Sequence, residues 1–151
     1  MSQSLQDLAV LQPEGWSAML ALGEHRTFAP QSVIFSDREP GWHLYVVRSG
    51  LVEILKETAP GIELRLAILE AGAVFGEGAL FEDSHRSATT RAFKEVEVIQ
   101  ISVTALRDFL ASHPAFALDF YRLLCGRLHR IMADLDADLK TLHRRLTNSQ
   151  S

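Results

Sequence analysis

The sequence predicts a mainly β domain with flanking helices: a β jelly roll preceded by N-terminal helices and followed by a long C-terminal helix. Between residues 24 and 102, short β-rich runs alternate with turn signals such as Ser49-Gly50, at the spacing typical of a sandwich or jelly roll. On either side of this stretch, apolar residues recur at helical spacing. Because 151 residues is close to the commonest domain size, we expect one domain over 1–151.

The first segment, residues 1–23, is expected to form short helices. Proline lacks a backbone N–H and interrupts a helix interior, so we expect Pro13 to separate two of them. The apolar residues that recur at helical spacing here are Leu5, Leu8, Leu11, Trp16, Met19 and Leu20.

The central segment, residues 24–102, is expected to form the strands of the jelly roll. Its runs are rich in β-branched and aromatic residues, which favour strands. The predicted strands are Val33–Phe35, Leu44–Val47, Leu51–Leu55, Ile62–Leu69, Val74–Phe75, Ala88–Phe93 and Val96–Ile101. The turn signals between them are Pro40-Gly41, Ser49-Gly50, Pro60-Gly61 and Ala71-Gly72.

The last segment, residues 103–147, is expected to form helices. Ser102 is predicted to cap the first of them, and His113-Pro114 is predicted to start the second. The second helix carries a heptad seam with its d positions at Leu128, Leu135 and Leu142, and the full seam is Leu128, Met132, Leu135, Leu139, Leu142 and Leu146.

Such a seam is predicted to pack against a partner helix, which makes the protein a homodimer. The alternative is that the seam packs on the protein's own barrel. At about 1.5 Å per residue, however, the helix extends beyond the surface that a barrel of this size provides.

Composition and charge restrict the classes of function. The formal net charge of −4 at pH 7 gives no overall basic surface, so direct DNA binding is not expected. The single cysteine, Cys125, has no internal partner for a disulfide, and the N-terminus has no signal-like apolar stretch. No run approaches membrane-spanning length. We therefore expect a cytoplasmic protein without a membrane contact, whose scattered histidines form no metal site.

Residues 75–88 form a glycine-punctuated stretch that predicts an anion pocket. Gly76 and Gly78 remove side chains where the backbone must approach a ligand or adopt a positive φ. The turn that follows them is suited to directing backbone N–H groups at a phosphate. Arg86 then supplies a guanidinium that matches two phosphate oxygens and stays charged.

This stretch closely resembles the phosphate-binding cassette of the cyclic nucleotide-binding domain family. The resemblance covers nearly the whole chain, because residues 28–50 are similar to the family's opening strands and their Leu-Tyr-Val-Val-Arg-Ser-Gly turn. Two positions depart from the family: Gln31 stands where glycine is common, and Gly78 stands where a larger apolar residue is usual. The resemblance implies a jelly roll that binds a cyclic nucleotide, and its activator branch dimerises through this last helix.

The resemblance also implies which residues contact the ligand. Arg86 would bind the cyclic phosphate, Ser87 would add a hydroxyl beside it, and Glu77 would accept a hydrogen bond from the ribose 2′-OH. The alternative is that Arg86 forms a structural ion pair with Glu77 or Glu82. The cassette residues are Phe75, Gly76, Glu77, Gly78, Ala79, Leu80, Arg86, Ser87 and Ala88, and the last helix offers Leu124, Arg127, Leu128 and Ile131 to the base.

The sequence defines the contacts to the base less well than the contacts to the phosphate. The family's activator branch presents hydroxyl-bearing residues to adenine, whereas Ile131 and Met132 stand at the matching positions here. These side chains cover a base by apolar contact but do not read its edge, and Ser87 is compatible with either purine. We favour cAMP over cGMP as the ligand and expect no cofactor.

The sequence shows no pairing of a nucleophile with a base, so an enzyme is not expected. Only five residues follow Leu146, and we predict a stand-alone cyclic nucleotide sensor that signals through its last helix to an unidentified effector protein. Three alternatives stay open: a ligand-independent dimeric interaction module, the sensor fragment of a Crp/Fnr-type transcription regulator, and a cyclic di-GMP receptor. The last of these needs a second basic residue, for which Arg91 is the candidate.

Overall fold

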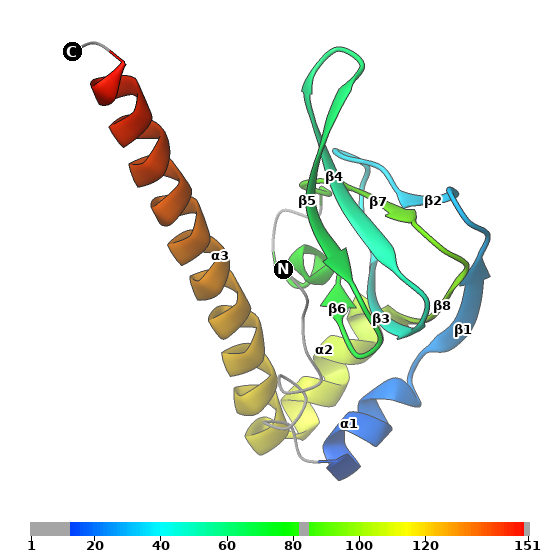
Figure 1. Cartoon of the computed structure of the whole chain (residues 1–151). Helices are drawn as coiled ribbons and strands as arrows, with labels where there is room; N and C mark the ends of the chain where they lie inside the picture. Colours follow the sequence, from blue (N-terminus) through cyan, green and yellow to red (C-terminus); the bar gives the residue numbers. More distant parts are fainter. Residues whose placement is uncertain (1–12, 82–84, 150–151) are drawn as a thin grey trace.

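Two four-stranded antiparallel sheets form the body of the protein (Figure 1). The computed structural model describes residues 13–81 and 85–149. One sheet has the order β1-β8-β3-β6 and the other β2-β7-β4-β5, which confirms the predicted jelly-roll fold. The strands are β1 (Glu24–Phe28), β2 (Val33–Phe35), β3 (His43–Ser49), β4 (Val52–Ala59), β5 (Ile62–Leu69), β6 (Val74–Phe75), β7 (Thr89–Ala92) and β8 (Val96–Ser102).

The seven strands predicted from β-rich runs are present, with ends shifted by a few residues. Strand β1, Glu-His-Arg-Thr-Phe, was not predicted from a β-rich run. It is almost wholly exposed. It lies at the edge of its sheet and pairs with β8, where Arg26 Nη1 donates to Gln100 Oε1. An edge strand with little buried surface needs few apolar residues, so its composition carries little signal.

Two apolar clusters hold the fold together. Alternate residues of β3 point to opposite faces of its sheet, so Tyr45 and Val47 lie in one cluster and Leu44 and Val46 in the other. The first cluster fills the space between the sheets. The second joins the β3 and β8 sheet to the helices, and Phe116 and Phe120 are among its buried members.

The helices are α1 (Pro13–Leu20), α2 (Val103–Ser112) and α3 (Pro114–Asn148). Pro13 begins α1, where proline is well tolerated, and the helix expected before it lies outside the described residues. Pro114 begins α3 as predicted. Ser102 occupies the N-cap position of α2, but its side chain makes no capping hydrogen bond, so that part of the prediction is wrong.

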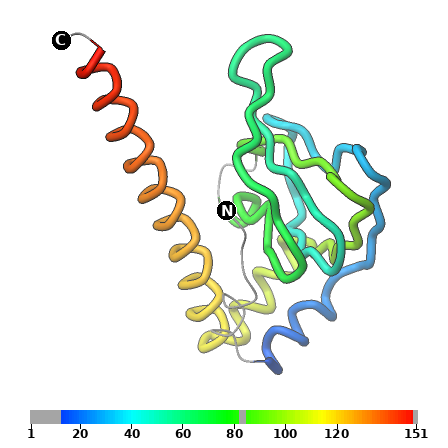
Figure 2. Tube along the Cα trace, in the orientation of Figure 1, coloured from blue at the N-terminus to red at the C-terminus, as the bar shows by residue number. Residues whose placement is uncertain are grey.

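The long helix α3 leaves the barrel after its first third, and its C-terminal end lies far from the sheets (Figures 1 and 2). Every residue from 128 to 149 is exposed. The six residues of the predicted seam are 54–65% exposed, so the alternative in which they pack on the protein's own barrel is wrong. This apolar face has no cover within the described chain.

Candidate anion-binding site

The predicted cassette connects the two sheets. Phe75 ends β6 in the first sheet, opposite Tyr45 of β3, and the chain then turns through the short 3-10 helix η2 (Glu77–Leu80). After the segment 82–84, which lies outside the described residues, Arg86 leads into β7 of the second sheet.

The backbone of Arg86 is fixed by the loop that follows β2. Its N–H donates to Glu39 O at 2.8 Å, and its carbonyl accepts from Arg38 N at 2.8 Å. Beside it, His85 forms an isolated antiparallel bridge with Pro40. The side chain of Arg86 is thereby directed between the sheets rather than into solvent.

The guanidinium of Arg86 is buried, with the residue only 7% exposed. Nη1 donates to Gly76 O at 3.0 Å and Nη2 donates to His43 O at 2.8 Å. Cζ lies 4.0 Å from the centroid of the Phe35 ring, so the aromatic face supplies a cation–π contact. Burial lowers the pKa of Arg86, and the nearby Tyr45, Glu39 and Glu77 oppose that shift. An arginine guanidinium nevertheless stays charged at neutral pH.

This buried charge has no carboxylate partner among residues 13–81 and 85–149 at ion-pair distance. Glu77, one of the two acids considered for a structural ion pair, contacts Arg127 instead, with Oε1 3.4 Å from Nη1. Glu82, the other, lies outside the described residues. In addition, Nε of Arg86 is buried without a hydrogen-bond partner in the described structure. A buried cation with an unused donor is the electrostatic signature of an anion site.

Two glycines make room for this guanidinium. Gly76 has φ +75°, as predicted, and a Cβ atom there would lie 2.9 Å from Nη1 of Arg86. A Cβ atom on Gly41 would lie 2.3 Å from Nε. Gly78 is different: its φ is not positive and a Cβ atom there meets no atom of the described protein within 4 Å, so a positive φ is not its reason, and its close approach to a ligand stays a prediction.

Both C-terminal helices contact the cassette through arginines. Arg127 of α3, besides its contact with Glu77, donates from Nη1 to Val74 O. Arg107 of α2 donates from Nη2 to Leu80 O at 2.7 Å. The acidic residue expected at the ribose therefore already contacts the helix expected to cover the base.

Comparison with known proteins identifies this arrangement. The family model described as "Cyclic nucleotide-binding domain" matches residues 25–113. The chain belongs to the cyclic nucleotide-binding domain family. The "CRP-like cAMP-activated global transcriptional regulator" of Mycobacterium tuberculosis is 30% identical to this cyclic nucleotide-binding domain over 85% of the chain and 57% of that protein.

Two solved structures share the fold. The crystal structure of Thermus thermophilus catabolite activator protein has a TM-score of 0.75 and 30% identity, and the match covers 87% of this chain and 61% of that one. The c-di-GMP responsive global regulator CLP of Xanthomonas campestris has a TM-score of 0.75 and 26% identity, with 82% and 60% covered. This cyclic nucleotide-binding domain thus spans a little over half the length of these relatives.

The remaining predicted site residues of the domain lie in two environments. In the cassette, Phe75, Ala79, Leu80 and Ala88 are buried, whereas Ser87 is exposed and its carbonyl accepts from Lys56 Nζ at 3.0 Å. On α3, Leu124 is buried in the cluster beneath the helices, Leu128 is 58% exposed, and Ile131 is 36% exposed. The structure therefore gathers the cassette with Arg86 and Arg127, and it places Leu128 and Ile131 on the exposed length of the helix.

Several residues of the site were not predicted. Phe35 and Tyr45 surround the guanidinium, with ring centroids 4.0 Å and 5.9 Å from Cζ of Arg86. The sequence predicts only a turn at Gly41, and it does not predict the contact of Arg107 with the cassette. The sequence held little signal for these contacts, because Leu44–Val47 of β3 is a continuous apolar run in which every residue is buried, so its pattern does not show which side chains face the guanidinium.

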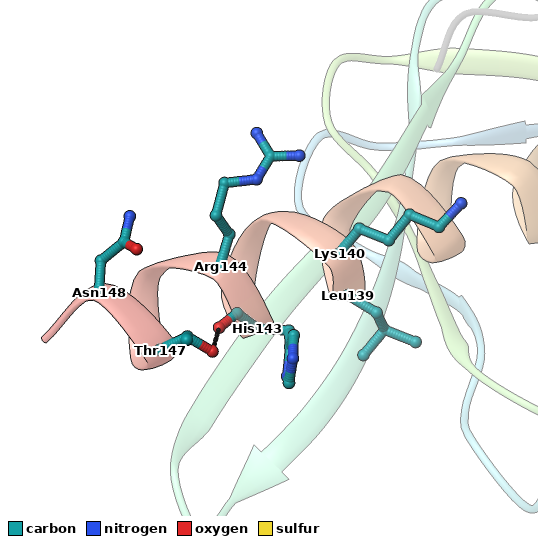
Figure 3. Close-up of a pocket in the computed structure, with 6 residues that line it drawn as sticks. All are labelled: Leu139, Lys140, His143, Arg144, Thr147 and Asn148. Atoms are coloured by element: carbon teal, nitrogen blue, oxygen red, sulfur yellow. Dashed lines mark hydrogen bonds between the residues drawn. The ribbon is translucent and has the colours of Figure 1, made fainter. Parts of the chain in front are cut away.

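A surface hollow of about 530 Å³ lies at the C-terminal end of α3 (Figure 3). Its lining residues all belong to the end of α3, so it has one wall only: Leu139, Lys140, His143, Arg144, Thr147 and Asn148. It reflects the uncovered face of α3 rather than an enclosed ligand site.

Among the described residues, no helix combines the length and apolarity that crossing a membrane requires.

Proposed function

We propose that this domain senses a cyclic nucleotide, cAMP in preference to cGMP, and transmits its occupancy through α3 to a partner protein in the cytoplasm. One observation carries the proposal: Arg86, a cassette residue just before β7, is a buried cation that no described carboxylate neutralises. A monoanionic phosphodiester supplies the missing charge in a low-dielectric setting, where the attraction is large.

The preference for cAMP is supported by what the relatives are called. The Mycobacterium tuberculosis regulator is named as cAMP-activated, and a Thermus thermophilus relative that is 31% identical over 129 residues is named "Cyclic AMP receptor protein". Within this chain, apolar groups such as Ile131 are suited to covering either purine, so the preference for adenine is a proposal taken from these relatives.

The route of the signal is proposed from Glu77. Its carboxylate contacts Arg127 on α3 through Oε1 and is also the group expected to accept from the ribose. A ligand that shares this carboxylate alters the contact that holds α3 to the cassette. Ligand affinity and helix position are then coupled, and each changes the other by the same factor.

The alternative ligand, cyclic di-GMP, is suggested by the name of the Xanthomonas campestris regulator. Its second phosphate would need a second cation near Arg86, and Arg91 was the candidate. Arg91 instead donates from Nε to Glu53 at 3.1 Å and from Nη1 to Glu63 at 3.3 Å on the outer face of its sheet. This disfavours cyclic di-GMP.

The test is calorimetric titration of the wild-type protein and Arg86→Ala with cAMP, cGMP and cyclic di-GMP. We expect Arg86→Ala to lose at least about a hundredfold in cAMP affinity, because two charge-assisted hydrogen bonds disappear. Arg48→Ala is the matched control, since Arg48 is exposed on β3. Wild-type affinity in Arg86→Ala would overturn the assignment of the site, and absence of binding by the wild-type protein would favour a ligand-independent module.

A further inference from the structure

Thr90 lies in the middle of β7, and its hydroxyl is buried without a partner. The residue is 1% exposed. Within residues 13–81 and 85–149, only two buried side-chain polar atoms have no hydrogen-bond partner, and they are Thr90 Oγ1 and Arg86 Nε. Because a buried hydroxyl that makes no hydrogen bond opposes folding, its presence calls for a reason outside the fold itself.

The register of the sheet shows which way this hydroxyl points. Thr90 lies opposite Phe35 of β2 and Ile54 of β4, and directly opposed residues share a face. The next residue, Arg91, points to the other face, where it pairs with Glu53. Thr90 therefore points into the barrel on the same face as Phe35.

The two unpartnered polar atoms belong to residues that both neighbour Phe35. The Phe35 ring lies 4.0 Å from Cζ of Arg86, and Phe35 is the direct cross-strand neighbour of Thr90. Cross-strand neighbours have Cβ atoms about 4.5–5.5 Å apart, so a small ligand bound at Arg86 lies within reach of the Thr90 hydroxyl. The neighbouring Thr89 gives the contrast, because its hydroxyl already accepts from Asp37 N at 3.0 Å.

We propose that Thr90 is a further ligand contact, whose hydroxyl hydrogen-bonds an oxygen of the cyclic ribose phosphate that Arg86 binds. This inference rests on the proposed function and deepens it. Since Thr90 is the cross-strand neighbour of Phe35, whose ring lies against the guanidinium of Arg86, it is placed to recognise the sugar-phosphate part that cAMP and cGMP share. It contributes to affinity and does not discriminate between the bases.

The test compares Thr90→Val, which keeps the shape and removes the hydroxyl, with Thr90→Ser, which keeps the hydroxyl. Calorimetry of the full chain should show that Thr90→Val weakens cAMP and cGMP by the same factor, about three- to tenfold, the value of one neutral hydrogen bond. Thr90→Ser should bind nearly as the wild type does. The ligand-free melting temperature of Thr90→Val should stay the same or rise, because an unsatisfied polar group is removed.

Thr89→Val is the matched control, and it should lower the ligand-free melting temperature while keeping nucleotide affinity. Wild-type affinity in Thr90→Val would overturn the role of Thr90 alone. So would a Thr90→Ser variant as weak as Thr90→Val, because the effect would then belong to packing. A wild-type protein that binds neither nucleotide would overturn the proposed function and this inference together.

Discussion

The guanidinium of Arg86 is held by carbonyl groups and an aromatic ring. None of these groups carries a negative charge that would neutralise it. Gly76 O and His43 O accept its hydrogen bonds, and Phe35 lies beneath it at 4.0 Å. Transferring a charge from water into a protein interior is unfavourable unless polar groups compensate. The carbonyls give part of this compensation, and the anionic ligand proposed for this site would complete it.

The space for this guanidinium depends on the absence of a side chain at Gly41. Adding one methyl group at this position therefore tests the site. A Cβ atom there would lie 2.3 Å from Nε and 2.4 Å from Cζ of Arg86, so Gly41→Ala should displace the guanidinium. The φ angle of Gly41 is not positive, so the backbone itself tolerates alanine. We expect cAMP affinity to fall about tenfold or more in calorimetry, since displacement weakens a charge-assisted contact.

Gly126→Ala is the control for that substitution. Gly126 lies in α3, and a Cβ atom there meets nothing within 4 Å, so affinity should be unchanged and helix stability should rise slightly. Retention of full cAMP affinity in Gly41→Ala would show that the guanidinium takes another position when ligand binds. The sequence marked Gly41 as a turn residue, but its contact with a residue 45 positions later depends on the folded topology.

Helices α2 and α3 contact the cassette near the two ends of η2: Arg107 of α2 donates to Leu80 O, and Arg127 of α3 contacts Val74 O and Glu77. β-rich runs between turn signals predicted seven strands, and helical spacing of apolar residues predicted the helices. They failed for β1, which is polar on nearly every position, and they did not predict the arginine contacts, which depend on how elements pack. The resemblance named Arg127 as a residue near the base, but not as the partner of Glu77.

The contact between α3 and the cassette predicts non-additive effects on binding. Glu77→Gln and Arg127→Ala should each weaken cAMP binding, and the double variant should lose less than the sum of the two. We expect a coupling energy of about 0.5–3 kcal/mol from calorimetric Kd values in a double-mutant cycle. Glu77→Gln combined with Arg48→Ala is the control pair and should be additive, because Arg48 is exposed on β3. Additivity in the Arg127 cycle would remove the proposed link from ligand to helix.

At the scale of the whole molecule, the C-terminal part of α3 presents a large apolar surface that no other described element covers. The seam residues of α3 are 54–65% exposed, and they follow the helix where it extends away from the sheets (Figure 2). The heptad spacing of these residues suits a parallel partner helix, so the proposed homodimer would bury them against a second copy. The position of this face also suits the proposed signal. Arg127, which contacts Glu77 of the cassette, lies one residue before Leu128, the first residue of the seam.

Replacing two d-position leucines tests this assembly. Leu135→Asp with Leu142→Asp should give a monomer by light scattering, because a dimer would bury four carboxylates in its seam. The control is Ala133→Asp with Ala137→Asp, which adds the same charge outside the seam and should remain dimeric. Both variants should keep their jelly roll, since the substituted residues are exposed in the single chain. If the seam variant stays dimeric, the interface lies elsewhere, and α3 then cannot carry the signal by repositioning two seams against each other.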